Sequence, residues 1–222
     1  MMSYNVDLVL CIDSTGSMKP IIEMVKRNAL NLYEDIQTEL RQKNKHIDQL
    51  RVRVISFRDY RADGENAMMV SDFFALPAEE SQLSDCVNQI KAIGGGDPPE
   101  DGLEALAYAI KSAWTQTGMK RRHIIVVWSD SPTHEIGYAK DSTHYPKGMP
   151  TDFSQLSAWW DDPQMGGSMD PHAKRLIIFA PNKPGWNRIS SSWDQVIHVQ
   201  TVGEGLSDVD YQMVLGTIGN SI

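Results

Sequence analysis

The feature that most constrains the fold of this chain is the alternation of short apolar stretches with longer amphipathic ones. Residues 6–12 and 124–128 are almost continuously apolar, which is typical of strands that are buried on both faces. In residues 18–41, by contrast, apolar side chains recur at helical spacing. Strands that alternate with helices predict a doubly wound, Rossmann-like three-layer α/β sandwich, with a mostly parallel central sheet and helices on both faces. One antiparallel edge strand is expected as well.

The other elements follow from the same patterns. Further strands are predicted at residues 50–57, 68–76, 175–179 and 196–202, further helices at residues 79–93, 153–161 and 207–218, and polar connections at residues 42–48 and 58–65. A chain of 222 residues is within reach of one sheet covered on both faces. We therefore expect a single domain over residues 1–222.

The fourth and fifth predicted strands are joined by a connection that is far longer than usual. It predicts an insertion at about residues 131–172, which contains the helix at 153–161, capped by Thr151 or Asp152. Because the insertion starts at a strand end, its first part is expected to lie beside a functional site, and such long loops often carry specificity. The alternative is a flap that covers the sheet.

Asp13, Thr15 and Ser17 form an Asp-x-Thr-x-Ser run directly after the first predicted strand. This is the carboxyl end of a strand, where open α/β sheets place their ligands. Three small oxygen ligands, with no Cys or His among them, suit a hard cation such as Mg²⁺. The alternative is that the two hydroxyls only cap the following helix and Asp13 only orders the turn.

Two later loops carry further acidic residues. A glycine-rich loop that leads into a helix contains Asp97, and a loop after the fourth predicted strand contains Asp130. Glu100 and Asp101 stand at the start of the helix, where we expect them to act through the helix macrodipole. The three loops are expected to meet, because they follow strands or precede helices at one edge of the sheet.

In these three loops the chain resembles von Willebrand factor A domains that carry a metal-ion-dependent adhesion site. The first motif of the family, Asp-x-Ser-x-Ser, matches Asp13, Thr15 and Ser17, with Thr in place of the first Ser, and Asp130 matches the Asp after the fourth strand. Where the family usually has a Thr on a Gly-Gly loop, this chain has Asp97. The variant is similar to A domains of atypical alpha-kinases and of bacterial tellurium-resistance and stress-response proteins. The resemblance implies one Mg²⁺ or Mn²⁺ held by these five residues.

The resemblance also implies a function. A cation in an incomplete cage of this kind binds an Asp or Glu side chain of another protein, so we expect a metal-dependent protein–protein interaction module in intracellular signalling or stress response. A kinase or a phosphatase is the candidate partner. The alternatives are a metal-dependent phosphoester hydrolase, for which only His134 or Glu135 offers a general base, and a metal-free scaffold. We expect no enzymatic activity.

The composition narrows the class of partner. A net charge of −8 argues against binding to nucleic acid or to an anionic membrane, since both require a basic surface. The sequence has no apolar stretch long enough to span a membrane and no signal-peptide pattern at its start. Its two cysteines, Cys11 and Cys86, are expected to be reduced rather than disulfide-bonded. These features favour a cytoplasmic protein, and a monomer.

Overall fold

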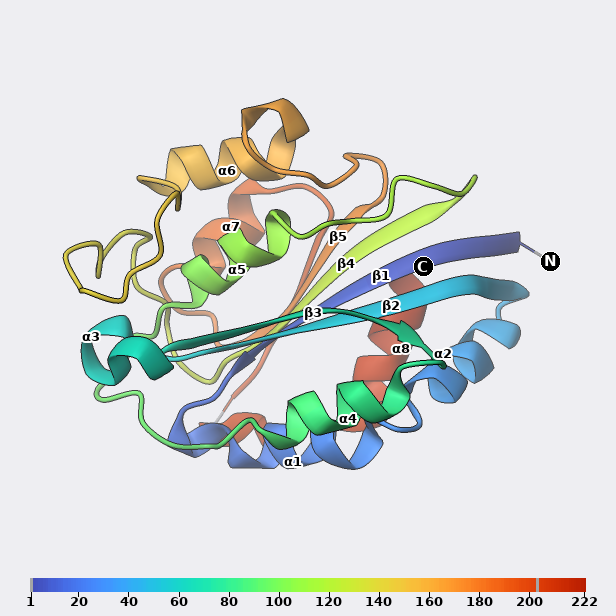
Figure 1. Ribbon diagram of the computed structural model, residues 1–222, viewed down its shortest axis with the longest axis horizontal. Coiled ribbons are helices and arrows are strands. Elements are labelled where there is room, and N and C mark those ends of the chain that lie inside the picture. The colour runs from blue at the N-terminus through green and yellow to red at the C-terminus, as the bar shows by residue number, and fades with distance from the viewer. Residues whose placement is uncertain (1, 203) are drawn as a thin grey trace.

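Six strands form one sheet in the order β3-β2-β1-β4-β5-β6 in the computed structural model, which describes residues 2–202 and 204–222. β3 runs antiparallel to β2 at one edge, and all the other neighbouring strands are parallel (Figure 1). This arrangement confirms the predicted fold class. The strands are β1 (Met2–Asp13), β2 (Lys45–Phe57), β3 (Met68–Leu76), β4 (Arg121–Trp128), β5 (Lys174–Ala180) and β6 (Val196–Gln200).

Helices cover both faces of the sheet (Figure 1). One face carries α1 (Lys19–Asn28), α2 (Leu32–Arg41), α4 (Glu80–Asn88) and α8 (Tyr211–Ser221), and the other carries α5 (Gly102–Ile110), α6 (Phe153–Asp161) and α7 (Trp186–Ser192). The short α3 (Tyr60–Asp63) lies at the carboxyl end of the sheet, and the 3₁₀ turns are η1 (Gly16–Met18), η2 (Gly64–Asn66), η3 (Pro163–Met165) and η4 (Glu204–Leu206).

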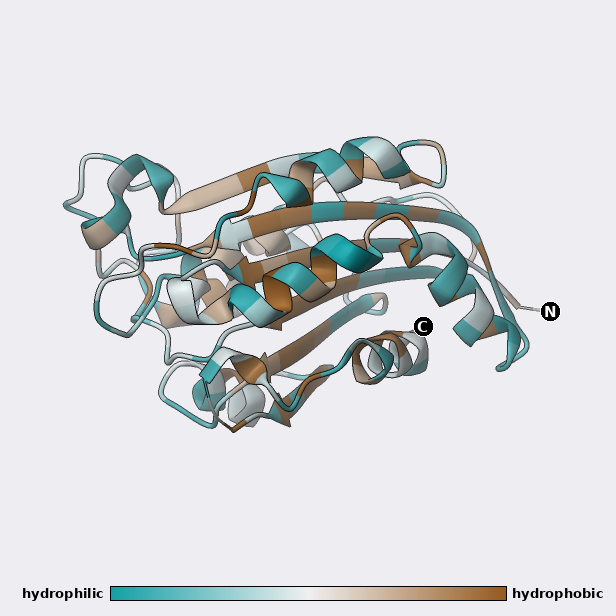
Figure 2. Cartoon of the chain, turned by 90° about the horizontal axis from the view of Figure 1, so that it is seen from below, coloured by the Kyte–Doolittle hydropathy of each residue, from teal (hydrophilic) through white to brown (hydrophobic). Residues whose placement is uncertain are grey.

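Two separate apolar cores result, one on each side of the sheet. In β1, Leu8 and Leu10 pack into the core beneath α1 and α8, whereas Val9 and Cys11 pack into the core beneath α5. Successive side chains of a strand point to opposite faces, so a central strand covered on both sides must be apolar throughout. Figure 2 shows this as strands with long hydrophobic stretches between helices that alternate between the two colours.

The helix predicted at residues 18–41 is wrong in one respect, because the structure divides it into α1 and α2. The side-chain amide of Asn28 donates a hydrogen bond to the carbonyl oxygen of Met24 (2.7 Å), and the N–H of Asn31 donates to the carbonyl oxygen of Asn28 (3.1 Å). Asparagine competes in this way for backbone partners and so favours a turn over a continuous helix.

Other boundaries also differ from the sequence expectations. β2 begins at Lys45 rather than at residue 50, α4 ends at Asn88 rather than at residue 93, and part of the polar connection at 58–65 is the helix α3. The helix α7 was not predicted. It buries Trp186 completely, and the indole N–H of Trp186 donates to the carbonyl oxygen of Ser131 (2.9 Å).

The insertion between β4 and β5 has two parts with different surroundings. The predicted helix at 153–161 is confirmed as α6, and the Asp152 side chain caps it by accepting a hydrogen bond from the N–H of Gln155. Trp159 and Trp160 of α6 are buried in the core beneath α5. The second part of the insertion is therefore a cover of the sheet, whereas the first part lies next to α3 and the carboxyl end of the sheet (Figure 1).

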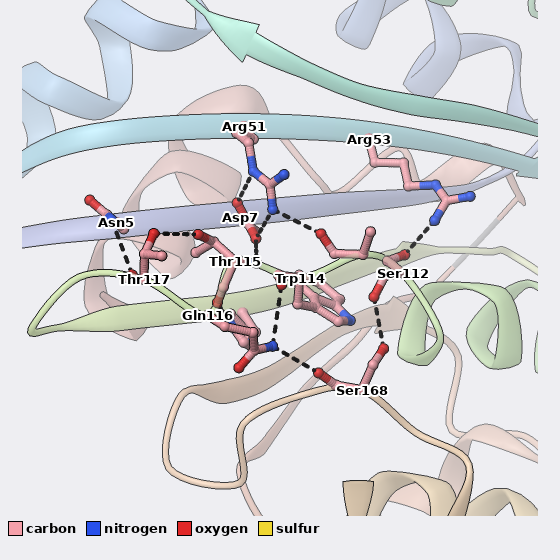
Figure 3. A network of polar contacts seen from close by, with 12 residues as sticks. Asn5, Asp7, Arg51, Arg53, Ser112, Trp114, Thr115, Gln116, Thr117 and Ser168 are labelled. Carbon is pink, nitrogen blue, oxygen red and sulfur yellow. Dashed lines mark hydrogen bonds and ion pairs between the residues drawn. The ribbon is translucent and has the colours of Figure 1, made fainter.

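A polar network fixes the other end of the insertion and the loop after α5 (Figure 3). Asp7 of β1 is fully buried, accepts two hydrogen bonds from the Arg51 guanidinium of β2 (2.8 and 2.6 Å) and one from the N–H of Thr115 (2.6 Å). The hydroxyl of Ser168 in the insertion donates to the carbonyl oxygen of Ser112 (2.7 Å). Such charge-assisted bonds compensate for the burial of the Asp7 carboxylate.

Within residues 2–202 and 204–222, no helix is long and apolar enough to cross a membrane. Cys11 and Cys86 are both free thiols, as expected.

Candidate metal centre

The predicted site lies at the carboxyl ends of β1 and β4, where the order of the strands in the sheet reverses direction. β1 is in the middle of the sheet, with β2 on one side and β4 on the other, so the connections leaving β1 and β4 diverge at their carboxyl ends. A switch of this kind is where open α/β sheets form a crevice for ligands. Asp13 ends β1, and Asp130 follows the end of β4 at Trp128.

Asp13 is completely buried and is held by three hydrogen bonds. Its Oδ1 accepts the N–H (3.0 Å) and the hydroxyl (2.7 Å) of Thr15, and its Oδ2 accepts the hydroxyl of Ser129 (2.8 Å). The Thr15 and Ser17 hydroxyl oxygens are 3.5 Å apart. The structure therefore brings Asp13, Thr15 and Ser17 together. Burial raises the pKa of Asp13 to about 6, although its hydrogen bonds to Thr15 and Ser129 oppose this shift.

Asp130 is half-buried beside the same loop. Its Oδ2 accepts the N–H of Gly205 (2.7 Å), and its charge contributes to the raised pKa of Asp13. Gly205 has a φ of 67°, and a Cβ at this position would lie 2.6 Å from the carbonyl oxygen of Ser17. Glycine is therefore required where the η4 turn packs against the Asp13 loop. The sequence alone did not indicate that η4 forms part of this site.

Asp97 differs from these four residues in its exposure. Its side chain is exposed, and in the part of the chain that the structure describes it takes part in no hydrogen bond or ion pair. The glycine-rich loop instead closes around Asp63 of α3, whose Oδ2 accepts the N–H of Gly95 (2.8 Å). The position of Asp97 near the ion stays a prediction, and no hydrogen bond joins it to Asp13, Thr15, Ser17 or Asp130 in the described part of the chain.

Glu100 is the acidic residue of the glycine-rich loop that turns inward. It is only 2% exposed, and its Oε2 has no hydrogen-bond partner among residues 2–202 and 204–222. A Cβ on Gly95 would lie 2.4 Å from the Thr15 methyl carbon and 3.0 Å from Glu100 Oε1, so both side chains lie against this glycine. Burial raises the pKa of Glu100 to about 9, and the charge of Asp13 adds to the shift.

Of the two acidic residues predicted at the helix start, Asp101 is the N-cap residue of α5, whereas Glu100 lies one residue before the cap. Glu100 instead forms an isolated parallel bridge with Thr133 of the insertion, and its N–H donates to the carbonyl oxygen of Pro132 (3.1 Å).

Arg58, which follows β2, forms hydrogen bonds with two of the loops around the site. This nearly buried guanidinium donates from Nε to the Ser14 carbonyl and hydroxyl oxygens (3.2 and 3.1 Å) and from Nη2 to the Lys91 carbonyl oxygen (3.0 Å). Its Nη1 is 3.8 Å from Asp63 Oδ1. Arg58 thus ties the end of β2 to the Asp13 loop and to the start of the glycine-rich loop.

The two residues considered as general bases are engaged elsewhere. The Nε2 of His134 is 3.2 Å from Asp59 Oδ2, and its ring stacks on Tyr138 with ring centroids 3.9 Å apart. Glu135 is exposed and pairs with Arg188 of α7 at 3.2 Å. His134 therefore orders the first part of the insertion against the loop before α3, as expected of a loop histidine.

The chemistry of the site is that of oxygen donors. Two hydroxyls, from Thr15 and Ser17, lie beside the carboxylates of Asp13, Asp130 and Glu100, and oxygen ligands of this kind suit Mg²⁺ or Mn²⁺. In the described ranges, no three His, Cys, Asp or Glu side chains converge closely enough to hold a metal by themselves. A cation here would depend on the hydroxyls as well as on the carboxylates.

Comparisons with known proteins agree with the fold. A family model described as von Willebrand factor A domain matches residues 7–132. The alpha-protein kinase vwkA from Dictyostelium discoideum is 28% identical over 145 residues, which are 65% of this chain and 21% of that protein. The chain thus spans about a fifth of the length of this curated relative.

Two solved structures are also similar to parts of the chain. The pilus adhesin SpaC from Lactobacillus rhamnosus GG is 15% identical with a TM-score of 0.42, over 59% of this chain and 16% of that one. The von Willebrand factor domain of the type V pili tip protein Mfa5 from Porphyromonas gingivalis is 20% identical with a TM-score of 0.37, over 59% of this chain and 39% of that one.

Proposed function

The chain belongs to the von Willebrand factor A domain family, whose model matches more than half of it, and we propose that it is a metal-dependent protein-interaction module. Domains of this family typically mediate protein–protein interactions. In our proposal, a Mg²⁺ or Mn²⁺ ion at the carboxyl end of the sheet binds an Asp or Glu side chain of a partner protein.

The observation that carries this proposal is the grouping of Asp13, Thr15 and Ser17 in one hydrogen-bonded loop beside Asp130. Mg²⁺ prefers octahedral oxygen coordination and readily retains waters. Neutral hydroxyl ligands compensate little of its charge, so an ion held by Thr15 and Ser17 attracts an outside carboxylate more strongly than one held by carboxylates alone. That Lewis-acid attraction is the chemistry that the cation would supply.

Glu100 supports the presence of a cation independently. A buried carboxylate oxygen without a partner, next to the buried Asp13, is costly unless a positive charge or a proton compensates for it. We therefore propose Glu100, in addition to Asp13, Thr15, Ser17 and Asp130, as a group that faces the cation. Asp97, which the sequence predicts as a metal ligand, is exposed. We propose that it contacts the partner protein or the water molecules bound to the ion rather than the ion itself.

The setting of the module is also part of the proposal. Two free thiols, Cys11 and Cys86, are typical of a reducing compartment, so we propose a cytoplasmic protein in signalling or stress response. A kinase or a phosphatase remains the partner class that we propose, in line with the similarity to part of an alpha-kinase. We propose no catalytic role, since His134 and Glu135 are both engaged in other contacts.

The proposal is tested by recovery of partners from the native cell in the presence of Mg²⁺ or of EDTA. We expect a specific partner to be retained with Mg²⁺, to be released by EDTA, and to be absent when Thr15→Val protein is the bait. Thr117→Val is the matched control, because this threonine is exposed at the opposite end of the sheet. A partner that binds equally well in EDTA and to Thr15→Val would contradict the proposal.

A further inference from the structure

The amino-terminal end of the sheet, opposite the candidate metal centre, carries a group of basic residues. Lys45 starts β2, Arg122 lies at the start of β4, and Arg175 lies at the start of β5. Since these strands are parallel, their first residues reach the same edge, which is on the right in Figure 1 together with both chain ends. We call Lys45, Arg122 and Arg175 the basic edge.

The strand register places members of the basic edge on one face. Arg122 lies across from Val6 of β1, and Arg175 lies across from Ile124 of β4. Val6 and Ile124 both point into the core beneath α8. Directly opposed residues of neighbouring strands point to the same side of a sheet, so both arginines emerge at the rim of the α8 face.

These cations repel one another, and none of them forms a close ion pair in the described part of the chain. Partial burial lowers the pKa of both Lys45 and Arg175, and the charge of Arg122 lowers each of them further, whereas the charge of Asp194 opposes the shift at Arg175. Among residues 2–202 and 204–222, none of the three is within ion-pair distance of a carboxylate. This is notable in a chain with a net charge of −8.

The acidic side chains at this end of the sheet pair with other cations instead. The pairs are Glu39 with Lys43 (2.7 Å), Asp170 with Arg121 (2.5 Å) and Asp194 with Lys174 (2.8 Å). The positive charge of the basic edge therefore remains available to a group from outside the domain.

A cleft of about 340 Å³ adjoins the basic edge, and Arg122 is part of its lining. Arg122 and Lys120 both lie over the ring of Tyr4, at 5.0 and 5.6 Å from its centroid. Met119, which also lines the cleft, is fully exposed. An exposed methionine beside cations offers an adaptable apolar contact next to a charged one.

We propose that the basic edge is a docking site for an acidic peptide segment of a partner protein. Its carboxylates contact Lys45, Arg122 and Arg175, and an apolar side chain of the segment packs into the cleft beside Met119. This site lies at the other end of the sheet from the candidate metal centre, and it needs no cation.

The geometry favours a peptide over other anions. Arg122 directs Nε to the carbonyl oxygen of Ser221 (3.2 Å) and Nη1 to that of Arg121 (2.8 Å), so its side-on Nε–Nη2 fork is occupied at Nε, and Nη2 with the second N–H of Nη1 remains for an outside oxygen. Single charges spread over three strands match carboxylates spaced along a chain. Extended polyanions such as nucleic acid or an anionic membrane would meet the net charge of −8 of the whole domain.

The test is fluorescence anisotropy with a labelled peptide of alternating Glu and Leu, measured in EDTA to remove any contribution of the metal centre. We expect saturable binding that weakens as NaCl is raised, and no binding of the peptide with Gln in place of Glu. The triple variant Lys45→Gln, Arg122→Gln, Arg175→Gln is expected to bind about tenfold more weakly.

The matched control is Lys140→Gln, Lys147→Gln, Lys183→Gln, which removes the same charge from exposed positions elsewhere. It should bind the peptide as the unmodified protein does. Because Arg122 also holds the end of α8, the double variant Lys45→Glu, Arg175→Glu provides a second test that leaves Arg122 in place. Equal weakening in the control, unchanged binding in both edge variants, or preference for inorganic phosphate or phosphatidylserine vesicles over the peptide would overturn the proposal.

Discussion

Asp97 and Glu100 lie close together in sequence but in opposite environments. Asp97 is exposed, whereas Glu100 is 2% exposed, lies against Gly95 and keeps one carboxylate oxygen without a partner in the described part of the chain. A side chain that is buried beside the hydroxyl-bearing loop contributes more to a bound cation than one that extends into solvent. The difference allows the two residues to serve as test and control for each other.

We predict that Glu100→Gln weakens Mn²⁺ binding by about tenfold or more, because the substitution removes a charge that faces the ion. Asp97→Asn should change the affinity by less than about threefold, since an exposed carboxylate acts through screened solvent. Isothermal titration calorimetry of both variants measures this directly. A larger loss in Asp97→Asn than in Glu100→Gln would restore Asp97 as the ligand that the sequence suggested.

The candidate site was predictable to the extent that it depends on short-range sequence. Asp13, Thr15 and Ser17 lie in one run, and Asp130 follows the neighbouring strand, so strand prediction alone brings these loops to one edge. The place of Glu100 depends instead on the path of the glycine-rich loop. That path is set by long-range hydrogen bonds, such as the one from Gly95 to Asp63, which no local pattern encodes.

His123 gives a residue-scale prediction for the dependence of stability on pH. The ring is completely buried, its Nε2 is 2.9 Å from the carbonyl oxygen of Thr115, and its Nδ1 accepts the N–H of Asp170 (3.1 Å). These contacts fit the neutral ring with the proton on Nε2, and a proton on Nδ1 would face the N–H of Asp170. Burial accordingly lowers the pKa of His123.

Because the folded-state pKa of His123 is below its unfolded value of about 6.5, the unfolded chain takes up the proton first as the pH falls. The contribution of His123 to stability is present above pH of about 6.5 and is lost below it, at up to about 1.4 kcal/mol per pH unit. Urea unfolding of the wild type and of His123→Gln, which retains an N–H donor, should diverge as the pH falls from 7.5 to 5.5. Parallel free energies of unfolding over this range would contradict the assignment.

At the scale of elements, the two halves of the insertion contact different parts of the domain. Its first half contacts Glu100, through the bridge from Thr133, and α5, where Gly137 and Tyr145 both donate to Glu104 Oε1 (2.9 and 2.8 Å). Its second half supplies α6, in which Trp160 stacks on Trp193 at 5.2 Å and donates from its indole N–H to Asp194. The covering role and the proximity to the site, which the sequence offered as alternatives, are divided between the two halves.

We predict that Trp160→Ala lowers the free energy of unfolding by about 3–5 kcal/mol, because it leaves a cavity in the core beneath α5. Met165→Ala, in the adjacent 3₁₀ turn, should change it by less than about 0.5 kcal/mol, since Met165 is 59% exposed. Guanidinium unfolding followed by circular dichroism measures both. If the two variants were equally stable, α6 would be a detachable appendage rather than part of the domain.

The elements that sequence patterns located least well are those whose limits depend on polar side chains. The apolar centres of β1 and β4 were located because burial on both faces demands a continuous apolar run, whereas their more polar first residues were not, since β1 starts at Met2 and β4 at Arg121. The β3 boundaries also agree with the prediction. The break after Asn28 depends on a single side-chain hydrogen bond, and α7 is a short helix defined by the burial of Trp186. Neither produces a strong helical period.

At the scale of the whole molecule, the domain has two chemically different ends. The carboxyl end of the sheet gathers acidic and hydroxyl side chains around Asp13, and the amino end carries the cations of the basic edge. A parallel sheet produces this polarity naturally, because all strand ends of one kind meet at one edge. The carboxyl end is the one that the proposed function depends on, and it is therefore the place for the decisive measurement.

That measurement is the titration of EDTA-treated, dialysed protein with Mn²⁺, with free Mn²⁺ followed by electron paramagnetic resonance. The account predicts one saturable site, displacement by Mg²⁺, and stabilisation of the fold by about 2.7 kcal/mol when Mn²⁺ is at 100 times its dissociation constant. Thr15→Val should lose the site, and Thr117→Val should keep it. No saturable binding by the wild type, or unchanged binding by Thr15→Val, would contradict the central claim that this loop holds a divalent cation.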